Sequence, residues 1–141
     1  MGAQACSMDL WQSTPAPRRA RGQIAYLAGL AAEAVVERAY LAQGAELLKR
    51  RWRGKAGEID LIFVDRQNGE EALIFAEVKA ARTHANAAHA LRPAQARRLC
   101  RAGQEFAGQR PSGQLTPMRF DLAMVDGQGQ VELLENAIGE F

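Results

Sequence analysis

Gly57-Glu58-Ile59-Asp60-Leu61-Ile62 and Glu77-Val78-Lys79 are two short stretches that both have the pattern of β-strands. Because side chains alternate between the faces of a strand, Glu58 and Asp60 are expected on one face, and so are Glu77 and Lys79. If the strands pair, three carboxylates and one ammonium gather in one patch. Such carboxylates repel one another unless a cation lies between them. Oxygen ligands beside a lysine suit a divalent metal and phosphoryl transfer.

The residues around both stretches form nearly continuous apolar runs, which are typical of strands covered on both faces. These apolar residues are Ile59, Leu61, Ile62, Phe63 and Val64, then Leu73, Ile74, Phe75 and Val78. Charges within such runs are costly unless they are paired or bound to metal, and this favours a functional site. The alternative is a half-exposed hairpin whose charges face the solvent and serve solubility.

The chain has 141 residues, of which 48% are hydrophobic, and a formal net charge of +2. These values predict one globular domain with a substantial core. No apolar run approaches the roughly 20 residues of a membrane helix, and Met1 to Pro17 lack the pattern of a secretory signal. Cys6 and Cys100 are too few for a disulfide framework and lack metal-ligand spacing. We therefore expect a cytoplasmic protein with reduced thiols.

The spacing of apolar residues and turn formers predicts the order helix, three strands, helix, two strands. Residues 1–20 are expected to form a flexible tail, and residues 21–141 a single domain. The expected helices cover 22–43 and Pro93 to about Gly108, and the expected strands cover 57–65, 72–80, 118–125 and 131–134. Residues 46–53 fit a first strand or a continued helix, 65–69 a hairpin loop, and 83–90 a loop or a short helix. The fold class is therefore α/β or α+β, a mixed sheet with one helix on each side or both on one face.

Basic residues form two groups that are candidates for binding nucleic acid. The first, Lys49, Arg50, Arg51, Arg53 and Lys55, leads directly into the acidic patch, and the second, Arg97, Arg98 and Arg101, shares a helix face; Arg82 completes the set. Arginine outnumbers lysine fifteen to three, and its planar fork suits phosphate. The alternatives are a solvated edge strand, an ordinary charged helix face and a bias in coding composition.

Other polar residues admit two interpretations. Glu33 lies in the middle of the first helix, where it either faces the sheet and completes a metal shell or is exposed. Asp121 is expected near the sheet edge or paired with an arginine. His84 and His89 flank a loop, and isolated loop histidines are seldom ligands or proton donors. Trp52 is expected to anchor the core.

The sequence resembles the YraN family of bacterial proteins in two stretches, Gly57 to Ile62 and, after a spacer, Phe75-Ala76-Glu77-Val78-Lys79. That family is similar to the PD-(D/E)XK nucleases, which include restriction-endonuclease-like proteins and archaeal Holliday-junction resolvases. The resemblance extends from about residue 29 to residue 138.

The resemblance implies a restriction-endonuclease-like core and assigns roles to particular residues. Asp60 and Glu77 would be ligands of Mg²⁺ or Mn²⁺, with the main-chain carbonyl of Val78 as a further ligand. Lys79 would position or activate the attacking water or stabilise the developing charge, and Glu33 would be an accessory acid. Glu58 also matches the family pattern.

The sequence departs from the family where Gln95 replaces a usual lysine, Arg51 a common asparagine, and His89 a frequent acid. The loop Ala80-Ala81-Arg82 lacks one commonly basic or hydroxylated residue. These changes bear on substrate affinity and geometry rather than on metal binding.

Three functions remain open at this point. The first is a metal-dependent endonuclease acting on structured or branched DNA. The second is a nucleic-acid-binding module of the same fold that cleaves inefficiently or needs a partner. The third is a protein-interaction partner with no role for nucleic acid. A homodimer is expected only by analogy with resolvases, which need two active sites.

Overall fold

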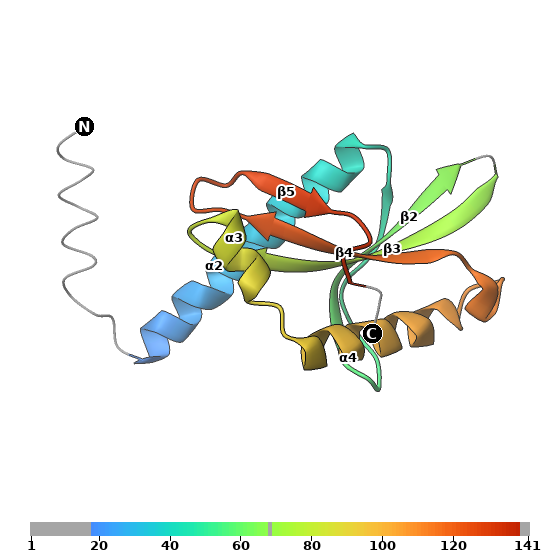
Figure 1. Ribbon diagram of the computed structural model, residues 1–141, viewed down its shortest axis with the longest axis horizontal. Helices are drawn as coiled ribbons and strands as arrows, with labels where there is room; N and C mark the ends of the chain where they lie inside the picture. Colours follow the sequence, from blue (N-terminus) through green and yellow to red (C-terminus); the bar gives the residue numbers. More distant parts are fainter. Residues whose placement is uncertain (1–17, 68, 139–141) are drawn as a thin grey trace. The chain divides into compact units, whose positions relative to one another are not determined.

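The computed structural model describes residues 18–67 and 69–138 (Figure 1). The chain separates into two units, residues 1–30 and 31–141. The helices are α2 (Arg18–Ala42), α3 (His84–His89) and α4 (Pro93–Ala107), with a short 3-10 turn, η1 (Gly113–Leu115). The strands are β1 (Glu46–Arg53), β2 (Glu58–Gln67), β3 (Glu70–Ala80), β4 (Met118–Val125) and β5 (Val131–Leu134). The sheet, α3, α4 and residues 31–42 of α2 all belong to the second unit.

Most of the predicted elements are confirmed. Residues 46–53 form a strand rather than a continued helix, and residues 84–89 form a short helix. The first helix begins at Arg18, so residues 18–20 are helical; residues 1–17 of the predicted tail lie outside the described residues. The hairpin loop predicted at 65–69 is tighter than expected, because β2 continues to Gln67 and β3 begins at Glu70.

The five strands form one mixed sheet in the order β1-β2-β3-β4-β5. Strands β1, β2 and β3 pair antiparallel, β3 pairs parallel with β4, and β5 returns antiparallel to β4. A parallel pair needs a long crossover, which α3 and α4 supply between β3 and β4. The expectation of an α/β or α+β mixed sheet is thus confirmed, with the order of elements as predicted plus α3.

Each face of the sheet carries its own apolar core, so the central strands are covered on both sides as predicted. On the α4 face, Phe75, Phe120 and their neighbours pack against Leu99 and Phe106 of α4. On the α2 face, Leu61, Phe63, Ile74 and Ala76 pack against Ala32, Val36 and Tyr40 of α2. The alternative with both helices on one face is excluded.

Helix α4 approaches the sheet most closely at Gly103. A Cβ atom at Gly103 would lie 2.4 Å from Cε1 of Phe120 and 3.1 Å from Cδ2 of Phe75. Trp52 meets the same helix edge-on, with 5.3 Å between its ring centroid and that of Phe106, in keeping with its predicted role in the core. In the part of the chain that the structure describes, no helix is both long and apolar enough to cross a membrane.

Candidate active site

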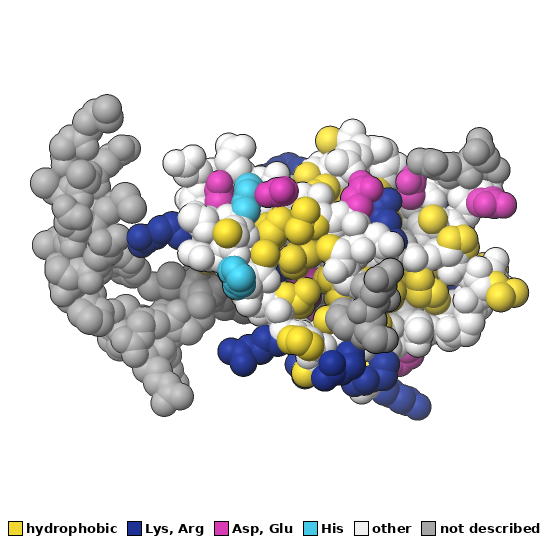
Figure 2. Space-filling model, in the orientation of Figure 1, with side chains coloured by type: hydrophobic (Ala, Val, Ile, Leu, Met, Phe, Trp, Pro, Cys, Tyr) yellow, Lys and Arg dark blue, Asp and Glu magenta, His cyan; other side chains and the backbone are white. Residues whose placement is uncertain are grey.

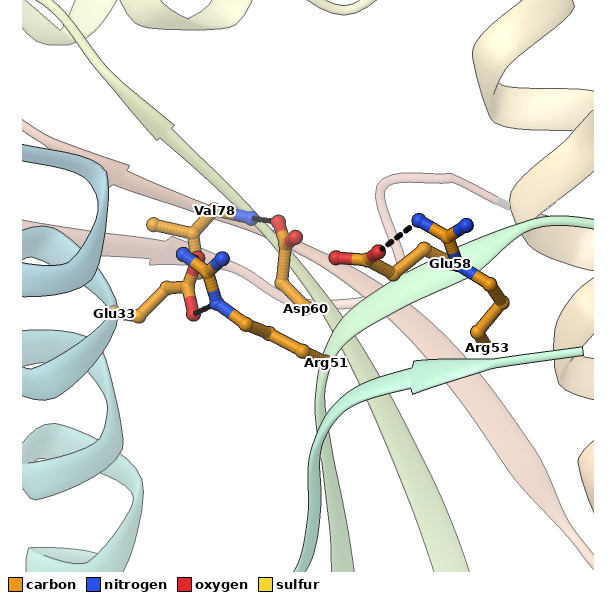
Figure 3. A network of polar contacts seen from close by, with 6 residues as sticks. All are labelled: Glu33, Arg51, Arg53, Glu58, Asp60 and Val78. Atoms are coloured by element: carbon orange, nitrogen blue, oxygen red, sulfur yellow. Dashed lines mark hydrogen bonds and ion pairs between the residues drawn. The ribbon is translucent and has the colours of Figure 1, made fainter. Parts of the chain in front are cut away.

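The candidate site lies where β2 and β3 separate. Their ladder ends at the pair Leu61↔Ala76, although both strands continue beyond it. Past this point the carboxylate of Asp60 replaces the strand as the hydrogen-bond partner, and its Oδ2 accepts the N–H of Val78 at 2.9 Å (Figure 3). The strand alternation also breaks near here, since Ile59 packs on the α4 face and Leu61 on the α2 face. The strict period of two expected for this strand is therefore wrong at Asp60.

Glu77 is the most perturbed acid of the site. Its side chain is only 8% exposed, and burial together with the charge of Asp60 and a hydrogen bond to Asp60 raises its pKa to about 8. Nζ of Lys79 lies 3.4 Å from Oε2 of Glu77, which places both side chains on one face as predicted. Gln95 of α4 donates a hydrogen bond to the same oxygen. Two carboxylates thus lie side by side with one ammonium.

A pocket of about 200 Å³ opens beside Glu77. One wall consists of Gly57 and Glu58, and the other consists of Gln95, Arg98 and Leu99 of α4. The pocket therefore brings an acid of the predicted site and an arginine of the second basic group to one cavity.

Glu33 faces the sheet, so the interpretation of an exposed helix residue is wrong. Its side chain is 15% exposed and accepts two hydrogen bonds from Arg51, Nε to Oε1 and Nη2 to Oε2, both at 3.0 Å. Burial raises the pKa of Glu33, the hydrogen bond from Arg51 opposes this, and the charges of Asp60 and Glu58 add to the rise. Figure 3 shows Asp60 between the Glu33–Arg51 pair and Glu58.

Strand β1 is irregular where it passes the site. Arg51 has a φ of 50°, in the left-handed region that residues other than glycine seldom adopt. As a result Arg50 and Arg51, although consecutive, both reach α2. Arg50 donates to Glu37 from Nε at 2.7 Å and from Nη2 at 2.9 Å, and Arg51 donates to Glu33 one helical turn away.

Glu58 stands at the rim rather than in the buried part of the site. It is an exposed residue, and Arg53 donates to its Oε2 at 3.0 Å. The turn before it is held by Glu105 of α4, whose Oε1 accepts the N–H of Lys55 at 2.9 Å and that of Ala56 at 3.3 Å. The turn is thereby joined to the C-terminal part of α4.

The predicted nucleic-acid-binding residues differ in their contacts. Arg50, Arg51 and Arg53 of the first group are paired with Glu37, Glu33 and Glu58. Arg97, Arg98 and Arg101 are exposed on α4, and Figure 2 shows Lys and Arg side chains gathered along the side of the molecule where α4 lies in Figure 1. Lys49, Lys55 and Arg82 are exposed. Arg98 of α4 therefore lines the pocket, whereas the three arginines of β1 are engaged in ion pairs.

The residues present fit a magnesium ion held by few protein ligands. Among residues 18–67 and 69–138, no three His, Cys, Asp or Glu side chains converge as metal ligands. Mg²⁺ is usually bound by one or two carboxylates and completes its shell with water and phosphate oxygens. The adjacent carboxylates of Asp60 and Glu77, one of them with a raised pKa, match that requirement.

The other polar residues of the sequence analysis have contacts that it predicted only in part. Gln95 contacts Glu77 directly, and its helical position three residues before Arg98 on the pocket side is the signal that could have shown it. Asp121 is fully buried in β4 rather than at the sheet edge, and it accepts from Arg119 as the second interpretation held. His84 is held against the β4–β5 turn by Gln130 and Glu132, and His89 is exposed.

Comparison with known proteins identifies the family. The model of the Uncharacterised protein family UPF0102 matches residues 32–125. A UPF0102 protein of Ruegeria sp. strain TM1040 is 51% identical over 121 residues, which cover 86% of this chain and 94% of the relative. One from Ruegeria pomeroyi is 51% identical over 119 residues, 84% of this chain and 94% of the relative. One from Roseobacter denitrificans is 47% identical over 119 residues, 84% and 89% of the two chains. The resemblance to the YraN family is thus confirmed, and the chain belongs to the UPF0102 family.

Proposed function

We propose that the protein is a metal-dependent endonuclease that hydrolyses phosphodiester bonds in structured or branched DNA. The observation that carries the proposal is the convergence of Asp60, Glu77 and Lys79 where β2 and β3 separate. The exposed arginines of α4 beside the pocket supply a place for the phosphate backbone. The proposal includes a cytoplasmic location and, by analogy with resolvases, a homodimer.

Asp60, Glu77 and the carbonyl of Val78 would hold the ion, Mg²⁺ or Mn²⁺. When bound there, such an ion polarises the phosphate and lowers the pKa of its bound water. The N–H of Val78 fixes one oxygen of Asp60, so that the carboxylate keeps its direction. Gln95 and Lys79 both contact Oε2 of Glu77 and orient that carboxylate in the same way.

Lys79 is the residue that acts on the reacting atoms. Its side chain is 20% exposed, so its ammonium is partly screened from water but still accessible. It can donate a hydrogen bond to a phosphate oxygen or hold the attacking water, and such a fixed charge stabilises the extra negative charge on phosphorus. Glu33 and Glu58 lie on either side of Asp60 and would tune its field as accessory acids.

A second candidate is a nucleic-acid-binding module that does not cleave. It is favoured by Gln95, which replaces a basic side chain of the family pattern and occupies an oxygen of Glu77. The arginines of β1 paired with Glu33, Glu37 and Glu58 also carry less charge outward.

The first experiment incubates the protein with labelled four-way junction, flap, single-stranded and duplex DNA in Mg²⁺ or Mn²⁺. Parent protein is compared with Glu77→Gln and with Glu70→Gln, a control on the exposed start of the same strand. If the protein is an endonuclease, the parent and Glu70→Gln cut and Glu77→Gln does not. Binding without cutting in all three supports the binding module, and neither binding nor cutting removes both functions.

The ligand assignment is tested by calorimetry with Mg²⁺ in the absence of DNA. Asp60→Asn keeps an oxygen for the N–H of Val78 but loses the charge, so Mg²⁺ binding should disappear while the fold remains. Lys79→Met should keep parental Mg²⁺ affinity and lose cleavage. Unchanged affinity in Asp60→Asn excludes Asp60 as a ligand, and parental cleavage by Lys79→Met excludes its catalytic role.

A further inference from the structure

The irregularity of β1 at Arg51 has a direct effect on the proposed metal site. The left-handed conformation there turns the side chain toward α2 and against Glu33, beside Asp60. Residues in such conformations cost free energy and persist where the surrounding contacts favour them. Here the conformation allows a two-point ion pair, the geometry in which arginine binds a carboxylate most strongly.

The ion pair with Arg51 engages both carboxylate oxygens of Glu33. Both of its carboxylate oxygens receive a hydrogen bond from the guanidinium, and the side chain is largely shielded from solvent. Two further carboxyl groups, those of Asp60 and Glu58, lie beyond this pair in Figure 3. Without Arg51, the largely buried carboxyl group of Glu33 would either take up a proton or bind another cation.

Two of the acids near Asp60 have different cations. Toward α4, Glu77 lies against Asp60 and contacts the ammonium of Lys79. Toward α2, Glu33 is neutralised by a permanently charged guanidinium. Enzymes that use two metal ions place them about 3.5–4 Å apart, where the ions stabilise the attacking and the leaving oxygen. If Arg51 were absent, Glu33 and Asp60 would offer two carboxylates to a second ion, next to the ion that Asp60 shares with Glu77.

We propose that the Arg51 guanidinium holds the place of a second cation, so that the chain binds a single divalent ion at Asp60 and Glu77. Glu33 becomes a metal ligand only when Arg51 is removed. Arg51 is thus a positioning residue that sets the number of ions. The inference rests on the metal site of the proposed function and adds the number of divalent ions that the site binds.

The test counts Mn²⁺ ions bound to the DNA-free protein, by calorimetry and by the paramagnetic resonance signal of free Mn²⁺. Arg51→Asn removes the cation and keeps a residue that tolerates the left-handed conformation. Arg50→Asn is the matched control, because it removes the neighbouring arginine–glutamate pair one helical turn away. We expect one ion in parent and in Arg50→Asn, two in Arg51→Asn, and one again in Arg51→Asn combined with Glu33→Gln.

The outcomes separate this inference from the proposed function. Two ions in the parent, or one ion in Arg51→Asn, overturns the role of Arg51 and leaves the nuclease proposal standing. No ion in any variant removes the metal site and the inference with it. Arg51→Gly, which also tolerates the left-handed conformation, provides a second measurement should Arg51→Asn fail to fold. It should bind two ions, and a single ion in this variant overturns the inference.

Discussion

Glu77 and Asp121 are two buried acids on neighbouring strands with opposite surroundings. In the β3–β4 register Asp121 lies beside Ala76, one position from Glu77, and the two carboxylates face opposite sides of the sheet. Asp121 accepts from the hydroxyl of Tyr40 at 2.7 Å, from Nε of Arg119 at 3.1 Å and from the N–H of Asn136 at 2.8 Å.

Glu77, in contrast, is buried against a second carboxylate, that of Asp60. Asp121 is surrounded by donors and ties α2 to the end of the sheet, whereas Glu77 has its pKa raised by burial and by its neighbour. Burial alone therefore does not distinguish a structural acid, such as Asp121, from a candidate functional acid, such as Glu77. The distinguishing property is whether the surrounding groups stabilise the charge or oppose it.

The largest effect is expected at the stabilised acid. Asp121→Ala leaves Tyr40, Arg119 and the N–H of Asn136 without their shared acceptor, and the free energy of unfolding should fall by about 3–5 kcal/mol. Urea denaturation measures the change. Glu135→Ala, which removes the exposed second partner of Arg119, is the control and should cost less than about 1 kcal/mol. Equal losses in both variants would contradict a central role for Asp121.

Glu77→Gln should remove a pH dependence of the free energy of unfolding. The folded-state pKa of Glu77 is about 8, above its ordinary value of 4.5, so the folded protein binds more protons between these values. The free energy of unfolding of the parent should therefore fall by a few kcal/mol as pH rises from about 5 to about 8. In Glu77→Gln this decline should disappear, as unfolding curves at several pH values without metal would show. A decline that persists in the variant would assign the titration to another group.

Tyr40→Phe removes one of the hydrogen bonds to Asp121 and should have an effect of intermediate size on stability. The stacking of ring 40 on Phe63, with centroids 4.4 Å apart, is kept, and only one donor to Asp121 is lost. The expected cost is about 1–2 kcal/mol in thermal or urea unfolding. A loss as large as that of Asp121→Ala would mean that Tyr40 alone stabilises the carboxylate.

The smallest effect is expected at the rim of the site. Arg53 is 78% exposed, and its ion pair with Glu58 is screened by solvent. Arg53→Gln should therefore change the free energy of unfolding by no more than about 0.5 kcal/mol. Thermal unfolding at low and high salt measures it, and a clear loss only at low salt would give the Arg53–Glu58 pair a larger role than its exposure suggests.

Local sequence patterns predicted the elements and the centre of the site. Pro93 and Gly108 mark the ends of α4, and the apolar runs mark β2 and β3. The spacing of Glu77 and Lys79 placed both on one face because β3 alternates regularly there. These features depend on residues close together in the chain, which is why the sequence reveals them.

Other features of the site depend on contacts between distant segments. The left-handed conformation of Arg51 accompanies its pairing with Glu33 on another element, and nothing in the run of basic residues on β1 signals it. The break in alternation at Asp60 arises because β2 and β3 separate. The full set of partners of Asp121 was unpredictable for the same reason, since Tyr40 and Asn136 lie far from it in the sequence.

The hydrogen bonds between Glu105 and the turn at Lys55 and Ala56 limit how the turn can move relative to α4. One wall of the pocket belongs to this turn and the start of β2, and the other to the N-terminal half of α4, while Glu105 joins them near the opposite end of the helix. The turn and α4 are therefore held together at Glu105. The amide protons of Lys55 and Ala56 should therefore exchange with solvent only when their hydrogen bonds to Glu105 break.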